Sequence, residues 1–168
     1  IRKQSGGKTK VVLLNRPTKM LSEFALVIIT GQFQTPKRDN ILSLDLPLMR
    51  IDAAKIDKAV KIWQPSFEAL KQPVTAVLIG GPTKPYYMDE AVIGTLLQQL
   101  EKQLSGGSLF ITTSPRTPDA VVDYLQQHKP SDSTLYCWQP DDSNNPYLAL
   151  LGLADYFVVT GDSLSMMV

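Results

Sequence analysis

The stretch VTAVLIGGPTKPYYMDE, residues 74–90, decides the fold. It opens with a continuous, largely apolar run from Val74 to Ile79, of the kind that forms a strand buried on both faces. Two glycines and a proline follow, and these residues end the strand in a turn. From Met88 to Leu104, apolar residues recur at helical spacing. The stretch therefore predicts a strand, a glycine-rich loop and a helix in succession.

The same succession repeats toward the end of the chain. Further strands are predicted over 109–112, 134–138 and 156–160, and further helices over 115–127 and 146–154. Strands that alternate with helices of this length form right-handed βαβ units around a parallel sheet. The fold class is therefore α/β, and we expect a Rossmann-like parallel sheet with at least four strands and with helices on both faces.

The N-terminal third is organised differently. Apolar runs at 11–14 and 24–30 predict two strands, and a third is expected near Asn40. An amphipathic helix is predicted from Ala53, broken near Pro65. The chain lacks an initial methionine and stops where a helix is just beginning, so we expect a fragment. We divide it into the C-terminal part of an N-terminal α/β domain (1–52), a helical linker (53–73) and a Rossmann-like C-terminal domain truncated at its end (74–168).

The composition is that of an ordinary globular protein, with 43% hydrophobic residues and 17 Lys and Arg against 16 Asp and Glu. A net charge near zero argues against a nucleic-acid partner. One cysteine, Cys137, and one histidine, His128, are too few for a disulfide or a zinc site, so we expect no metal. No apolar run approaches the roughly 20 residues of a membrane span, and no signal-peptide pattern is present. This favours a cytoplasmic location, with peripheral membrane attachment as an alternative.

The charge is uneven along the chain. Residues 1–52 hold nine basic and four acidic side chains, whereas the remainder holds more acidic than basic ones. Such an asymmetry marks either a surface for phosphates or anionic lipid or, more commonly, a solvated basic face.

In a parallel α/β sheet, ligands bind beyond the carboxyl ends of the strands, where loops enter helix N-termini. In the first such loop, Gly80 and Gly81 allow close approach of a backbone to a ligand, and Lys84 is placed to meet a phosphate; Thr83 lies in the same loop. The alternative is a Gly-Pro turn in which Asp89 caps the next helix. The sequence leaves both interpretations open.

The second strand-end loop contains Ser114 and Arg116. Ser114 stands before Pro115 in a helix-start pattern, with serine as the N-cap and proline at the first helical position. Arg116 then falls in the first turn, where the helix dipole disfavours a cation. An arginine placed against this preference indicates an anion-binding site or, equally, a surface charge.

The third and fourth loops are also polar. Asn145 precedes a proline and repeats the cap-then-proline pattern. Gly161, Ser163 and Ser165 form a small, hydroxyl-rich loop that suits a backbone cradle for a diphosphate, although any strand-to-helix turn has a similar composition.

Several other motif matches fail. The string GGKT at 6–9 has the end of a phosphate-binding loop, but the first glycine of that motif falls on Arg2 and no strand precedes it. The acidic pair at 141–142 is interpreted as turn chemistry, because no further metal ligands accompany it. His128 is interpreted as a cap at a helix C-terminus. Neither a G-x-G-x-x-G run nor a Ser-His-Asp set can be argued.

Four strings, taken in order, resemble one family. They are FALVIIT at 24–30, VLIGGPTKPYYMDE at 77–90, ITTSPRTP at 111–118 and NPYLALLGLADYFVVTGDSLSM at 145–166. Together they are similar to the mitochondrial-fission, elongate-mitochondria family, whose bacterial members are often labelled predicted nucleoside-diphosphate-sugar epimerases. The resemblance covers nearly the whole chain.

The resemblance implies a B-type glycosyltransferase-like arrangement, in which two Rossmann-like domains face a cleft and the C-terminal one holds a nucleotide-sugar donor. On this chain, Gly80 and Gly81 match the first donor loop, and Gly161, Ser163 and Ser165 match the later one. A ribose-binding glutamate is expected just past the end of the chain. The catalytic base of such enzymes comes from the N-terminal domain, so the catalytic residues stay unknown. The epimerase label fits poorly, because the dinucleotide fingerprint is missing.

The resemblance implies two functions. The first is binding of a nucleotide-diphosphate sugar as the donor substrate, with transfer of its sugar and no separate cofactor. The alternative is a non-catalytic adaptor that recruits protein partners at a membrane surface. Fold alone does not choose between them.

Overall fold

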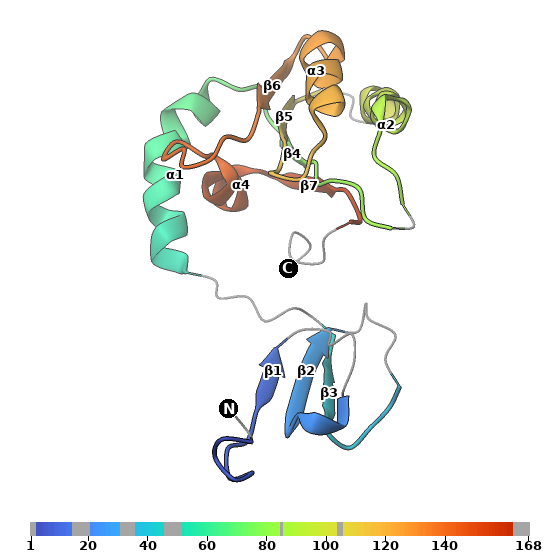
Figure 1. Ribbon diagram of the computed structural model, residues 1–168. Helices are drawn as coiled ribbons and strands as arrows, with labels where there is room; N and C mark the ends of the chain where they lie inside the picture. The colour runs from blue at the N-terminus through green and yellow to red at the C-terminus, as the bar shows by residue number, and fades with distance from the viewer. Residues whose placement is uncertain are drawn as a thin grey trace. The chain divides into compact units, whose positions relative to one another are not determined.

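The computed structural model describes residues 3–14, 21–30, 36–45, 52–84, 86–103 and 106–162. The chain forms two compact units (Figure 1). The first unit holds β1 (Val12–Leu14), the short 3-10 helix η1 (Leu21–Glu23), β2 (Leu26–Thr30) and β3 (Ile41–Leu44). The second unit holds α1 (Ala53–Glu68), β4 (Val74–Leu78), α2 (Glu90–Gln103), β5 (Ser108–Thr112), α3 (Asp119–His128), β6 (Ser133–Tyr136), α4 (Tyr147–Leu153) and β7 (Tyr156–Val159). No helix within these described ranges is long and apolar enough to cross a bilayer.

The sheet of the second unit is wholly parallel, in the order β6-β5-β4-β7. The chain lays down β4, β5 and β6 in one direction and then crosses back to place β7 on the other side of β4. This doubly wound order confirms the α/β, Rossmann-like class that the alternating pattern predicts. The reversal leaves the ends of β4 and β7 side by side at the topological switch point.

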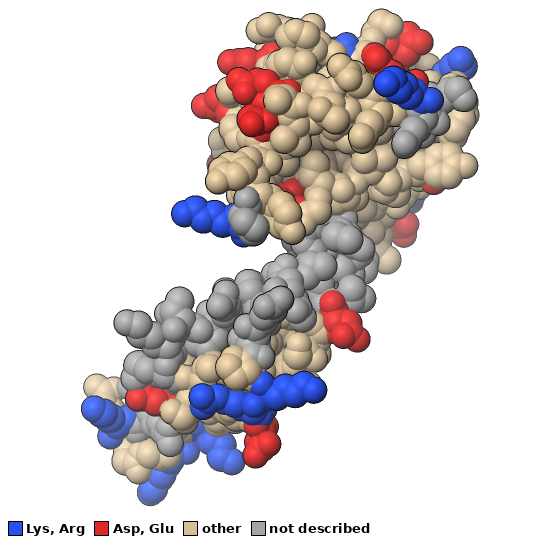
Figure 2. Space-filling model, turned by 90° about the vertical axis from the view of Figure 1, so that its right-hand side faces the viewer, with Lys and Arg blue, Asp and Glu red and all other residues tan. Residues whose placement is uncertain are grey.

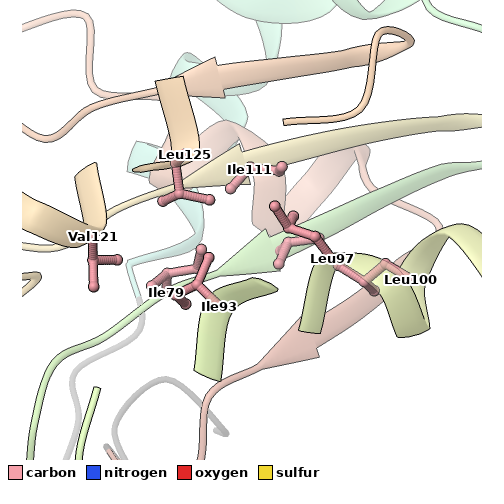
Figure 3. Close-up of a cluster of buried hydrophobic side chains, with 8 residues drawn as sticks. Ile79, Ile93, Leu97, Leu100, Ile111, Val121 and Leu125 are labelled. Carbon is pink, nitrogen blue, oxygen red and sulfur yellow. The ribbon is translucent and has the colours of Figure 1, made fainter. Parts of the chain in front are cut away.

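Helices cover both faces of this sheet, with α2 and α3 on one face and α1 and α4 on the other (Figure 1). Alternate side chains of a strand point to opposite faces, and β4 serves both layers. Val77 belongs to a buried cluster with α2 and α3, whereas Ala76 belongs to a second cluster with Phe67 of α1 and Leu150 of α4. Figure 3 shows side chains of the first cluster: Ile79, Ile93, Leu97, Leu100, Ile111, Val121 and Leu125.

Helix α1 corrects the sequence prediction, because it continues through Pro65 instead of breaking there. A proline inside a helix removes one hydrogen bond and crowds the preceding turn. Aromatic packing on both sides of it holds the helix in place. The ring of Phe67 stacks on Phe110 of β5 at 5.2 Å between centroids, and Trp63 meets the same ring edge-on at 6.1 Å. Helix α1 also packs against α4 and belongs to the second unit.

The first unit contains a separate parallel sheet in the order β1-β2-β3. Val27 and Ile29 of β2 are buried on one of its faces. The opposite face carries Val12, Leu14 and Leu42, which the strand register places together and which are all exposed.

The basic residues of the first unit are surface residues. Its described Lys and Arg side chains are all exposed, namely Lys3, Lys8, Lys10, Lys37 and Arg38. Figure 2 shows blue basic side chains spread over this unit. This exposure fits a solvated basic face and equally allows the alternative of a phosphate or lipid surface.

Gly152 of α4 lies against Val60 of α1, and its substitution tests that packing. A Cβ atom there would lie 2.5 Å from Cγ2 of Val60. We expect Gly152→Ala to lower the free energy of unfolding by about 1–3 kcal/mol through overpacking. This loss should appear in urea denaturation even though alanine is the better helix former by about 1 kcal/mol.

A Val60→Ala background provides the control for this prediction. The obstructing methyl group is gone there, so Gly152→Ala should become neutral or stabilising. An equal loss in both backgrounds would show that the cost arises elsewhere than in the contact with Val60.

Candidate functional site

The candidate site lies at the carboxyl edge of the second unit's sheet, where β4 and β7 end side by side. The loops that follow β4, β5 and β7 meet there through polar groups. They bring together five of the residues predicted from the sequence: Gly80, Gly81, Thr83, Arg116 and Gly161. Doubly wound folds bind their ligands at this edge, next to the switch point.

The centre of this arrangement is Asp162, whose side chain is only 5% exposed. Its carboxylate accepts hydrogen bonds from Nη2 of Arg116 at 2.6 Å, from the backbone N–H of Gly81 at 3.1 Å and from the hydroxyl of Thr160 at 2.5 Å. The other terminal nitrogen of Arg116, Nη1, donates to the hydroxyl of Thr83 at 3.3 Å. One carboxylate therefore joins loops that follow three different strands.

Arg116 lies in a turn before α3, which corrects its predicted place in the first helical turn. Helix α3 begins only at Asp119. Ahead of it, the hydroxyl of Thr117 accepts the N–H of Ser114 at 2.9 Å and donates to the carbonyl of Gly80 at 2.7 Å. This anchor holds residues 114–117 as a turn against the end of β4. Ser114 is therefore not the cap of α3, and the dipole argument for an anion at Arg116 loses its premise.

Gly80 and Gly81 are required by contacts within the protein itself. A Cβ atom at Gly80 would lie 2.1 Å from Oδ2 of Asp162, and one at Gly81 would lie 2.2 Å from the backbone carbonyl oxygen of Arg116. Gly161 differs, since a Cβ atom there would have nothing within 4 Å. The close backbone approach that the paired glycines indicate is therefore an approach between loops of this chain.

A pocket of about 630 Å³ opens beside Asp162, between α2 and the ends of β4 and β7. Its volume is within the range of small-molecule sites, about 300–1,000 Å³. Tyr86 and Tyr87 lie at this pocket and are 70% and 84% exposed. Its apolar and aromatic lining consists of Tyr86, Tyr87, Met88, Val92 and Leu96.

A second pocket, of about 260 Å³, opens at the ends of β4, β5 and β6. Two predicted site residues, Ser114 and Asn145, line it together with Thr113, Trp138 and Tyr147. The side chain of Asn145 accepts the N–H of Tyr147, the first residue of α4, at 2.9 Å. The N-cap of α4 is Pro146, one residue later than the cap-then-proline pattern predicts, so Asn145 precedes the helix and borders the pocket.

The remaining predicted residues stand apart from this network. Lys84 is exposed and lines neither of the two pockets. Ser163 and Ser165 lie outside the described residues. Asp89 accepts the N–H of Val92 at 2.9 Å, so the interpretation of Asp89 as the cap of α2 is confirmed.

The loop after β6 shows the turn chemistry that its acidic pair predicts. Asp141 has a positive φ of 57°, and Asp142 accepts the N–H of Asn144 at 2.8 Å and the hydroxyl of Tyr136 at 2.7 Å. The hydrogen bond from Asn144, followed by that from Tyr136, holds the pKa of Asp142 below its ordinary value. Burial, followed by the contact with Asp142, raises the pKa of Tyr136 to about 12.

Two further expectations concern metal ligands and His128. Among the described residues, no group of three or more His, Cys, Asp or Glu side chains could hold a metal ion. His128 is the last residue of α3, and its Nδ1 lies 3.0 Å from the carbonyl oxygen of Tyr124. The two rings also stack at 4.1 Å, so His128 interacts with its own helix end, as its predicted capping role requires.

Sequence reasoning misses the two residues that organise the site, Asp162 and Thr117. The signal for Asp162 is a pair of opposite charges in loops that a parallel sheet brings to one edge, Arg116 after β5 and Asp162 after β7. Thr117 has no comparable signal, because its hydroxyl reaches β4 only once the turn before α3 has formed.

Comparisons with known proteins point to one family. A sequence model of the family described as "Mitochondrial fission ELM1" matches residues 1–168. The chain is 28% identical over 189 residues to "Mitochondrial fission protein ELM1" of Arabidopsis thaliana, which covers 99% of this chain and 44% of that protein. It is 34% identical over 116 residues to an uncharacterised protein of Rickettsia prowazekii, which covers 67% of this chain and 32% of that protein. The chain thus spans less than half the length of these relatives, and no solved structure matches it significantly.

Substitution of Gly81 tests the close contact between the loops after β4 and β5. Gly81→Ala should lower the free energy of unfolding by about 1–3 kcal/mol, because the new methyl group meets the backbone of Arg116. Gly161→Ala is the matched control, since its methyl group enters open space and stability should change by less than about 0.5 kcal/mol. Chemical denaturation measures both, and equal effects at the two glycines would contradict the assignment.

The raised pKa of Tyr136 predicts a loss of stability at high pH. A tyrosine ionises near pH 10 in the unfolded chain but near pH 12 here, so its contribution is complete below pH 10 and is lost as the pH rises toward 12. We expect the difference in unfolding free energy between wild type and Tyr136→Phe to shrink across this window. Other ionising groups are common to both proteins and cancel in the difference, so a constant difference would be evidence against this pKa shift.

Proposed function

The chain belongs to the mitochondrial fission ELM1 family, and from that premise we propose that its second unit binds a nucleoside-diphosphate compound of the nucleotide-sugar type at the carboxyl edge of the sheet. The observation that carries the proposal is a charged centre flanked by two pockets. The larger pocket is lined by Asp162, and the smaller one by Ser114, two residues before Arg116. The ion pair between Arg116 and Asp162 links the two loops.

This arrangement matches the chemistry of such a compound, which has an anionic middle and two largely uncharged ends. Arg116 is half-exposed, and it uses one hydrogen bond from each terminal nitrogen within the described part of the chain. A guanidinium has five N–H donors, so donors stay available for phosphate oxygens. The two tyrosines of the larger pocket offer aromatic faces for a planar ring.

The proposal concerns the binding of the compound and not the transfer of its sugar. Transfer of a sugar would also require an acceptor and a catalytic base. The two relatives are each more than twice as long as the part that aligns with this chain, so these two requirements are questions for the whole protein. The nucleotide-sugar proposal therefore assigns residues to the binding site and none to catalysis.

A second candidate is a non-catalytic adaptor that recruits a protein partner at a membrane surface. The exposed pair Tyr86 and Tyr87 favours it, because exposed aromatic residues are typical of protein interfaces. The internal use of the Gly81 N–H by Asp162 also favours it. The Arabidopsis relative is named a mitochondrial fission protein, which is compatible with such a role.

Calorimetry with uridine and guanosine diphosphates and their sugar derivatives tests the proposed binding. We expect saturable binding by the wild type and a loss of at least tenfold in affinity for Gly161→Leu. A Cβ atom at Gly161 has nothing within 4 Å and Gly161 lines the larger pocket, so we expect the leucine side chain to occupy part of that pocket. Gln98→Leu is the matched control, since Gln98 is exposed on α2 and outside this pocket.

The outcomes separate the two candidates. Undiminished affinity in Gly161→Leu would move the ligand away from the larger pocket. Absence of binding to every nucleotide, in the wild type and in variants whose Asp162 has been neutralised, would reject the proposal and favour the adaptor.

A further inference from the structure

The carboxylate of Asp162 has the surroundings of a bound anion. It receives a guanidinium from Arg116, a backbone N–H from Gly81 and a hydroxyl from Thr160, all between 2.5 and 3.1 Å. These are the donor types that proteins direct at phosphate oxygens. Its side chain is 5% exposed, so these donors replace water almost completely.

The space for this carboxylate is made by Gly80. A Cβ atom on Gly80 would lie 2.1 Å from Oδ2 and 2.2 Å from Oδ1 of Asp162. The site therefore has room for this carboxylate only because residue 80 has no side chain. An oxyanion from solution would enter the same space from the larger pocket, which Asp162 and Gly81 both line.

Asp162 is attached in a way that permits exchange. The ladder between β4 and β7 ends with Leu78 and Val159, and Thr160 makes the last backbone hydrogen bond to β4 at 3.1 Å. Asp162 lies two residues beyond that bond, after Gly161, whose surroundings are open. Its carboxylate can leave the donors without unpairing the sheet.

We propose that Asp162 is an internal competitor for the phosphate of the ligand: an external phosphate binds the Gly81 N–H and Arg116 by displacing this carboxylate. The inference rests on the proposed function for the identity of the ligand. A tethered carboxylate competes at a high effective concentration. A phosphate, with more charge and more acceptor oxygens than a carboxylate, is the ligand class that can displace it. Asp162 thereby selects diphosphates over simple carboxylates.

The test measures the affinity for inorganic pyrophosphate and for uridine diphosphate by calorimetry in the full chain at low ionic strength. Asp162→Asn and Asp162→Ala remove the competing charge. Glu101→Gln removes an equal charge from an exposed position on α2 that lines neither pocket. A double variant, Asp162→Asn with Arg116→Gln, removes the principal donor as well.

We expect both Asp162 variants to bind pyrophosphate at least tenfold more tightly than the wild type and Glu101→Gln, and we expect the double variant to lose this gain. Unchanged or weaker affinity in both Asp162 variants would overturn the proposal and leave Asp162 as a clamp between loops. If uridine diphosphate binds no protein of the set while pyrophosphate shows the gain, the proposed nucleotide function fails and the anion site stands.

A measurement on the wild type covers the case in which neither variant folds. Saturating pyrophosphate should shift the backbone amide resonance of Gly81, whose N–H changes its partner, and that of Asp162, whose side chain leaves its donors, in nuclear magnetic resonance spectra. Amides of the α1–α4 interface, such as that of Gly152, provide the control and should stay in place. Saturation without a shift at Gly81, or no saturation at all, would overturn the proposal.

Discussion

The covered carboxylate of Asp162 is the point on which the carboxyl edge of the sheet depends, since it joins the loops after β4, β5 and β7. Several features of the chain make this contact geometrically available. The doubly wound strand order sets β7 beside β4, and the absence of a side chain at Gly80 leaves room for the carboxylate. Thr117 fixes the turn that carries Arg116 against β4. The contact between Arg116 and Asp162 therefore depends on the strand order, and no single loop would provide it.

The sequence predicts the second unit's architecture well because its strands are buried on both faces. All five residues of β4 are buried, so the apolar run 74–79 reflects the central place of β4 in the sheet. Helix ends are harder to predict, since tertiary contacts decide them. Aromatic rings around Pro65 hold α1 together where local rules predict a break, and the Thr117 hydroxyl delays the start of α3. Neither contact has a counterpart in the local pattern.

For the site, the sequence predicts the location and several of the residues, but not their pairing. A glycine pair after a strand indicates a close backbone approach without saying which atoms approach. In this chain the partners are Asp162 and the backbone of Arg116, contributed by loops 35 or more residues further along. The sequence also marks Arg116 as a cation in a strand-end loop, and in the structure its partner is a carboxylate of the same chain, that of Asp162. Pairing of this kind follows from strand order, which local sequence does not encode.

The positions of the two tryptophans give the second unit a pair of separate optical reporters. Trp63 stands edge-on to Phe110 between α1 and the sheet, whereas Trp138 lines the smaller pocket near β6. Indole emission depends on the polarity of its surroundings. With Trp63 replaced by phenylalanine, indole emission would come only from Trp138 at the smaller pocket. With Trp138 replaced by phenylalanine, it would come only from Trp63 between α1 and the sheet. Occupancy of the smaller pocket and packing of α1 against the sheet can thus be followed independently by fluorescence, without an attached dye.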